Sequence, residues 1–163
     1  MSMTTNKVLV RQYLRRHPAT PTKAVNGAIR TLHRLKADKD LKHICHVELS
    51  DDPSQVTPNG AGFRRGNCSV VNVEPRDSED EVGAAFTLRH EAIHARVIAE
   101  KGKEAVEGGR GRQHEIAAHE ETVRFGQAWL AREKDASTRK RIEEELADEK
   151  ASIAHLKAQG DEV

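Results

Sequence analysis

The feature that most constrains this chain is an H-E-x-x-H pentad, His90-Glu91-Ala92-Ile93-His94. It lies in a segment, residues 81–99, whose apolar residues recur at the three- and four-residue spacing of an amphipathic helix. Two side chains four residues apart lie on the same face of a helix, so His90 and His94 can turn their imidazoles toward one metal ion. The pentad therefore predicts a helix that carries two metal ligands.

Glu91 lies about 100° round the predicted helix from His90, which places it beside such an ion. A zinc ion lowers the pKa of its bound water to about 7, and a neighbouring carboxylate can take the proton that this water loses. The pentad therefore favours hydrolytic chemistry with Glu91 as the general base.

A catalytic zinc site usually has three protein ligands and one open position, so a third ligand must come from elsewhere in the chain. Residues 114–121 offer the candidates. Glu115 is favoured because it follows His94 by twenty-one residues, an interval that fits a helix end, a connection and a returning helix. His119 is the alternative, as a ligand, as an electrophile for a substrate carbonyl or as a hydrogen-bond partner of the site. Glu120 and His114 also remain open as ligands.

Over about residues 68–129 the sequence resembles the gluzincin branch of zinc metallopeptidases, in which H-E-x-x-H on one helix is completed by a Glu from the next. The resemblance rests on four residues: His90, Glu91, His94 and Glu115. It implies a zincin-like fold, a Zn²⁺ cofactor and a peptide or protein substrate.

One position departs from the gluzincin pattern. Gluzincins often place an Asp four residues after the ligand Glu, and this chain has His119 there. The sequence is also similar to minimal bacterial and phage-type H-E-x-x-H proteins, some of which are secreted effectors or toxins.

The remaining periodicities predict an α+β chain that is mostly helical, with a small antiparallel or mixed sheet. We expect helices over about residues 6–15, 20–36, 81–102, 113–134 and 138–158. Alternation and β-branched residues predict strands over residues 43–49 and 68–73, which we expect to pair antiparallel.

Local signals predict how these elements are joined. Ser78 and Glu81 fit a capping box for the pentad helix. Residues 51–62 hold two prolines and an Asn-Gly pair, which indicates turns. Residues 103–113 contain three glycines, Arg110 and Arg112. This composition predicts a mobile loop that either closes over substrate, with an arginine near a developing oxyanion, or only spans the distance between helices.

The length of 163 residues predicts one domain with a helical appendage: residues 1–134 as the metallopeptidase domain and residues 135–163 as a charged C-terminal helix. In this last helix four apolar residues approximate a single seam: Ile142, Leu146, Ile153 and Leu156. The seam is a candidate for forming a homo-oligomer or for packing on the domain.

Composition limits the partners. Charged residues make up 33% of the chain and the mean hydropathy is −0.73, which excludes a membrane-spanning helix. The net charge of +1 and the few aromatic residues, three Phe, one Tyr and one Trp, disfavour nucleic acid as a partner.

The N-terminus lacks an apolar core for a signal peptide, so we expect a cytoplasmic protein of the producing cell, with signal-less secretion as the alternative. Cys45 and Cys68 are expected to be reduced, although adjacent strands could hold them close enough for a disulfide.

Two other classes of protein compete with the peptidase interpretation. The first is a non-catalytic zincin-like module in which a metal is structural or lost and a helical surface binds another protein. The second is an all-helical interaction protein in which the pentad arose by coincidence. A site closed by four protein ligands would favour the first of these rivals, because catalysis needs an open position.

Overall fold

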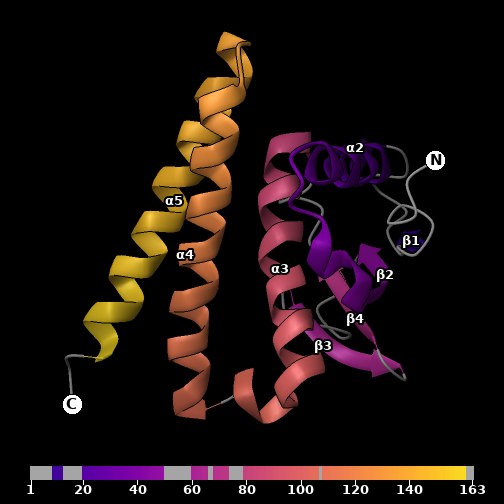
Figure 1. The fold of residues 1–163 in the computed structure, drawn as a ribbon, viewed down its shortest axis with the longest axis vertical. Coiled ribbons are helices and arrows are strands. Elements are labelled where there is room, and N and C mark those ends of the chain that lie inside the picture. The colour runs from indigo at the N-terminus through magenta and orange to yellow at the C-terminus, as the bar shows by residue number, and fades with distance from the viewer. Residues whose placement is uncertain are drawn as a thin grey trace.

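The structure is a computed structural model, and it describes residues 9–12, 20–49, 60–65, 68–73, 79–106 and 108–160. Helices make up most of the described chain, as predicted (Figure 1). The elements in chain order are β1 (Leu9–Gln12), α2 (Thr20–Arg34), η1 (Lys39–His43), β2 (Ile44–Leu49), β3 (Gly60–Arg65), β4 (Cys68–Val73), α3 (Glu81–Lys101), η3 (Lys103–Val106), α4 (Gly108–Arg132) and α5 (Ala136–Gly160).

The strands form a mixed sheet in the order β1-β2-β4-β3. β1 and β4 run parallel to β2 on either side of it, and β3 pairs antiparallel with β4 at one edge of the described sheet. The expectation that β2 and β4 pair antiparallel is wrong. We expected turns through Gly62 and no further strand between residues 49 and 68. Instead, β3 reverses the chain once and β4 reverses it again, which leaves β4 parallel to β2.

Helix α3, which carries the pentad, contacts the sheet, α2 and both long C-terminal helices. In Figure 1 it stands between the sheet on one side and the α4–α5 pair on the other. Its buried residues Phe86, Leu88 and Ile98 belong to the same core as Ile29 of α2 and Val71 of β4. The residues of α3 are therefore held from several directions, which fixes the helix that presents the pentad.

Helices α4 and α5 form a long hairpin that packs against α3. Phe86 of α3 meets Phe125 of α4 edge to face, with ring centroids 5.5 Å apart, and stacks on Trp129 with centroids 6.3 Å apart. Ile142 and Leu146 of α5 are buried in this core. The first half of the predicted seam therefore packs against the rest of the chain. The domain boundary near residue 135 stays a prediction.

The prediction of a helix over residues 6–15 is wrong for the part that the structure describes, residues 9–12. Residues 9–12 form strand β1, which pairs with β2 from Leu9 opposite His46 to Gln12 opposite Leu49. Four residues fit a helical and an extended pattern equally well, and pairing with a neighbouring strand decides between them. The rest of that predicted helix lies outside the described residues, as do residues 51–59 of the predicted turn.

The predicted mobile loop over residues 103–113 is also wrong. η3 occupies its first residues, and α4 begins at Gly108, so that Arg112 lies within a helix. A Cβ atom on Gly111 would lie 2.8 Å from the carbonyl oxygen of Val106. At this position glycine permits a close approach of two backbone segments, and it does not mark a flexible loop.

Cys45 is disulfide-bonded, which contradicts the expectation of reduced cysteines. It lies at the start of β2, and the one other cysteine of the chain, Cys68, begins β4. These two strands are hydrogen-bonded neighbours in parallel register, with Ile44 opposite Ser69. Parallel pairing brings the starts of both strands to the same end of the sheet.

None of the described helices combines the length and the apolar content that crossing a bilayer requires.

The N-terminus of α3 is capped by Asp80, whereas the sequence predicted Ser78, which lies outside the described residues. The Asp80 carboxylate accepts a hydrogen bond from the Gly83 amide at 2.7 Å and another from the Arg141 guanidinium of α5 at 2.7 Å. Partial burial opposes ionisation of Asp80, but these two hydrogen bonds outweigh it and lower the pKa of the carboxyl group. Its contribution to stability is therefore present above the unfolded pKa of about 3.9 and is lost as pH falls through the lower folded value.

We predict that Asp80→Ala lowers the free energy of unfolding by about 1 kcal/mol at pH 7, because it removes the cap. Asp80→Asn keeps a capping side chain and loses only the charge, so its cost should be smaller. Urea denaturation at pH 7 and at pH 3 measures both variants. The parent should approach Asp80→Asn as the pH falls, whereas the difference between the two variants should stay the same, because neither side chain ionises. A constant difference between parent and Asp80→Asn would contradict this account.

Gly126 lies where α3, α4 and α5 meet. A Cβ atom at this position would lie 2.6 Å from Cζ of Phe86 and 2.7 Å from Cδ2 of Leu146. We predict that Gly126→Ala destabilises the chain by about 1–2 kcal/mol, because overpacking costs more than the gain of about 1 kcal/mol in helix propensity. The control is Gln127→Ala on the exposed face of the same turn, which should be near neutral. Thermal unfolding followed by circular dichroism compares the two, and a stabilised Gly126→Ala would refute the close packing.

Candidate metal centre

The two histidines of the pentad lie on one face of α3, as the sequence predicts. Their ring centroids are 4.5 Å apart, and the two Nε2 atoms approach within 2.8 Å. Each side chain is 12% exposed, so the nitrogens face a nearly buried space. The helix and its packing therefore aim two imidazole nitrogens at a common point.

Glu115 of α4 completes this arrangement. Its Oε1 atom lies 3.4 Å from Nε2 of His90 and also contacts Nε2 of His94. The connection through η3 turns the chain back, so that the start of α4 passes the second half of α3. The structure thus brings together the three predicted ligands, with two imidazole nitrogens and one carboxylate oxygen directed at one point.

Glu91 lies beside these groups and is 4% exposed. Its Oε1 atom is 4.0 Å from Nε2 of His90, whereas its Oε2 atom is buried and has no hydrogen-bond partner. Burial raises the pKa of the Glu91 carboxyl group above its ordinary value. A desolvated carboxylate with an unused oxygen next to a candidate metal position is suited to accept a proton from water.

His119 also joins the cluster. Its Nε2 atom lies 3.4 Å from Oε2 of Glu115, and its ring centroid is 4.5 Å from that of His90. Its Nδ1 atom lies 2.5 Å from Oε2 of Glu149, which comes from α5. Burial opposes protonation of His119, but its hydrogen bonds to Glu115 and Glu149 outweigh burial and raise its pKa to about 9.

Glu149 is a site residue that the sequence reasoning missed. It lies three residues after Leu146 and four before Ile153, in register with the apolar seam of α5. A charged residue in an otherwise apolar seam is a signal that could have found it, because a buried or half-buried charge needs a partner. In this chain His119 is that partner, so α5 contributes to the candidate site.

The two other ligand candidates are His114 and Glu120. Neither lies where His90, His94 and Glu115 meet. Nε2 of His114 lies 2.6 Å from Nδ1 of His94, the ring nitrogen opposite the one that faces Glu115. It can therefore fix the tautomer and orientation of His94 as an outer partner. Burial and the neighbouring His94 lower the pKa of His114 to about 4, which keeps it neutral at pH 7. No described hydrogen bond or ion pair joins Glu120 to this cluster.

Charges within the cluster are strongly coupled. Burial opposes both protonation of His94 and ionisation of Glu115, but the contacts between carboxylate and imidazoles outweigh it. The pKa of His94 is therefore raised and that of Glu115 is lowered. An ionised carboxylate among imidazoles provides the negative charge that a divalent cation needs.

A partly buried ion-pair network on another face of α3 holds that helix against η1 and α4. Asp40 of η1 accepts hydrogen bonds from Arg89 at 2.8 Å and from Arg96 at 2.9 Å. Arg96 also donates to Glu121 of α4 at 3.1 Å. Because these charges are paired across three elements, they fix the rotation of α3 and the position of α4, and with them the separation of the three candidate ligands.

No protein-family model, curated protein or solved structure matches this chain.

We predict that the purified chain binds one equivalent of zinc and that His94→Ala and Glu115→Ala each retain well under one equivalent after dialysis. His155→Ala is the matched control, because it removes an exposed imidazole of α5 whose described hydrogen bond is to Gln159; it should keep the metal. Elemental analysis measures the stoichiometry. Full zinc content in His94→Ala, or equal loss in all three variants, would contradict the ligand assignment.

Proposed function

We propose that the chain is a zinc-dependent peptide hydrolase of the zincin type. The observation that supports this most strongly is the convergence of His90, His94 and Glu115 from two helices, with Glu91 buried beside them. A pentad that arose by coincidence gives no reason for a carboxylate from another helix to meet both imidazoles.

The donor set fits the proposed metal. Two imidazole nitrogens and one carboxylate oxygen are a ligand combination of catalytic zinc sites, which leave a further position open. The buried Oε2 atom of Glu91 has no partner within the described chain, which is costly unless a ligand or water satisfies it. A zinc ion held by His90, His94 and Glu115 would lower the pKa of water and polarise the scissile carbonyl.

The chain's own residues would carry the proton transfers. Glu91 would accept a proton from the attacking water and pass it to the leaving amine as the peptide bond breaks. Its raised pKa suits this exchange, since the carboxyl group must both take and release a proton near neutral pH. The low exposure of Glu91 would keep bulk water from competing for that proton.

His119 would support the reaction from the far side of Glu115. With its Nδ1 held by Glu149, the imidazole is kept in one orientation, and its Nε2 faces the cluster. A protonated imidazole in this position would stabilise negative charge on the carbonyl oxygen of a substrate. Glu149 would act as a positioning residue for His119.

The sheet offers a way to hold an extended substrate. β3 lies at an edge of the described sheet and contacts α3. Extended peptides add to such edges through backbone hydrogen bonds, which align the chain without fixing its side chains. We therefore infer a peptide or protein substrate.

A non-catalytic metal-binding module is the second candidate function. It is favoured by His119, whose Nε2 lies 3.4 Å from Glu115 and whose ring lies close to His90. As a fourth protein ligand it would close the site, and a closed zinc site stabilises a fold and has no open position for water.

We predict that Glu91→Gln keeps one equivalent of zinc and the parent melting temperature but lowers peptide hydrolysis at least about 100-fold, the contribution typical of a general base. The assay uses quenched fluorescent peptide libraries with the zinc-loaded full chain. His119→Ala separates the two candidate functions: retained zinc with weaker hydrolysis supports the peptidase, whereas lost zinc supports the closed site. A fully active Glu91→Gln variant would overturn the mechanism.

A further inference from the structure

A cleft of about 390 Å³ opens on another face of α3 from the metal centre, where the end of α2 and the segment leading to η1 approach α4. None of the histidines or glutamates of the metal centre lines it. Five cationic side chains and one carboxylate do: Lys36, Lys39, Arg89, Arg124, Arg132 and Glu121. We call this feature the basic cleft. Because the whole chain has a net charge of only +1, this excess of positive charge is local.

Four of the five cations take part in none of the ion pairs that the structure describes. Lys36, Lys39, Arg124 and Arg132 are exposed, and no described ion pair includes any of them. The single lining carboxylate, Glu121, is already paired with Arg89 and Arg96. The basic cleft therefore carries uncompensated positive charge that a bound anion would neutralise.

Arg89 makes the cleft more than a group of surface cations. Its side chain is 9% exposed, and its position is fixed by Asp40 and Glu121. Its buried Nε atom has no hydrogen-bond partner in the described structure. A buried, oriented guanidinium with an unused donor is a common means of recognising phosphate and carboxylate groups.

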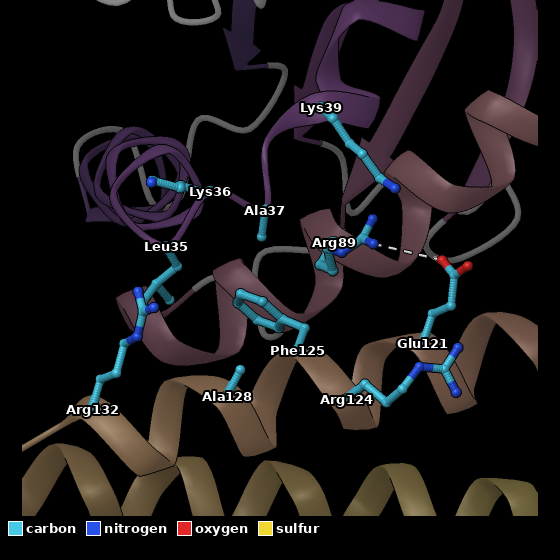
Figure 2. Close-up of a pocket in the computed structure, with 10 residues that line it drawn as sticks. All are labelled: Leu35, Lys36, Ala37, Lys39, Arg89, Glu121, Arg124, Phe125, Ala128 and Arg132. Carbon is cyan, nitrogen blue, oxygen red and sulfur yellow. Dashed lines mark ion pairs between the residues drawn. The ribbon is translucent and has the colours of Figure 1, made fainter.

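Apolar side chains line the middle of the basic cleft. Figure 2 shows the Phe125 ring between its two ends, with Leu35 and Ala37 above and Ala128 below. Arg132 rises toward Leu35 at one end, and Lys39 reaches toward Arg89 and Glu121 at the other. A free inorganic ion would leave this apolar surface uncovered, whereas an organic molecule would cover it, and the volume lies within the range of small-molecule sites.

We propose that the basic cleft binds a small organic oxyanion, a molecule that carries a phosphate or carboxylate group on an apolar body. The oxyanion lies near Lys39 and Arg89 or near Arg132, and the apolar body packs on Phe125 and Leu35. This site is independent of the proposed hydrolase function and shares no side chain with the metal centre.

Isothermal titration calorimetry on the full chain in 0.15 M salt tests the proposal with four probes: 1-naphthyl phosphate, 1-naphthoate, 1-naphthol and inorganic phosphate. We expect one of the two naphthyl anions to bind at least about tenfold more tightly than both naphthol and inorganic phosphate, because only these anions satisfy the charge and the apolar surface together. Whichever anion binds better identifies the preferred oxyanion. Equal binding of naphthol and both naphthyl anions would overturn the proposal.

Charge-reversal variants locate the binding. Lys39→Glu and Arg132→Glu change exposed side chains without described ion pairs, so both should fold, and at least one should weaken binding about tenfold. Lys150→Glu, an equal charge change on the exposed side of α5, is the matched control and should bind like the parent. Retained binding in the His94→Ala variant separates this site from the metal centre. Equal weakening by Lys150→Glu, or binding of an oligonucleotide without binding of either naphthyl anion, would refute the small-molecule site.

Discussion

The contact between the Glu115 carboxylate and the two pentad imidazoles is the interaction on which the candidate site depends. It joins two imidazoles of α3, each 12% exposed, to a carboxylate of α4 that is 36% exposed, and a charged imidazole so deeply buried would be costly without this partner. Both helices must therefore keep one rotation and one separation. The aromatic packing of Phe86 against Phe125 and the ion pairs around Asp40 hold them there from two other directions.

The same helices serve two chemically different surfaces. One face of α3 and α4 presents imidazoles and carboxylates, which suit a divalent cation, and another face presents the cations of the basic cleft. Arg89 directly precedes His90 in the sequence, yet the 100° step between neighbouring helical residues directs the two side chains to different faces. Arg89 and Glu121 of the basic cleft are paired with Asp40 and Arg96, so the exposed cations of the cleft supply its excess of positive charge.

The sequence predicted most of the candidate metal centre, because the spacing of residues along a helix determines which side chains share a face. A spacing of four residues places His90 and His94 on one face, and the apolar pattern alone predicts that helix. Contacts between different helices and strands were harder to predict from the sequence. Nothing local distinguishes β1 from a short helix, and the direction of β4 depends on β3, which the turn-rich composition of residues 51–62 concealed. Glu149 became a site residue only because α5 folds back onto α4, although its place in an apolar seam was visible.

The most direct test of this account is anomalous scattering at the zinc absorption edge from a crystal of the full chain. The account predicts one zinc ion bound by His90, His94 and Glu115, with its remaining position open to solvent and Glu91 next to it. A zinc ion enclosed by four protein side chains, or no zinc at these residues after zinc has been supplied, would contradict it.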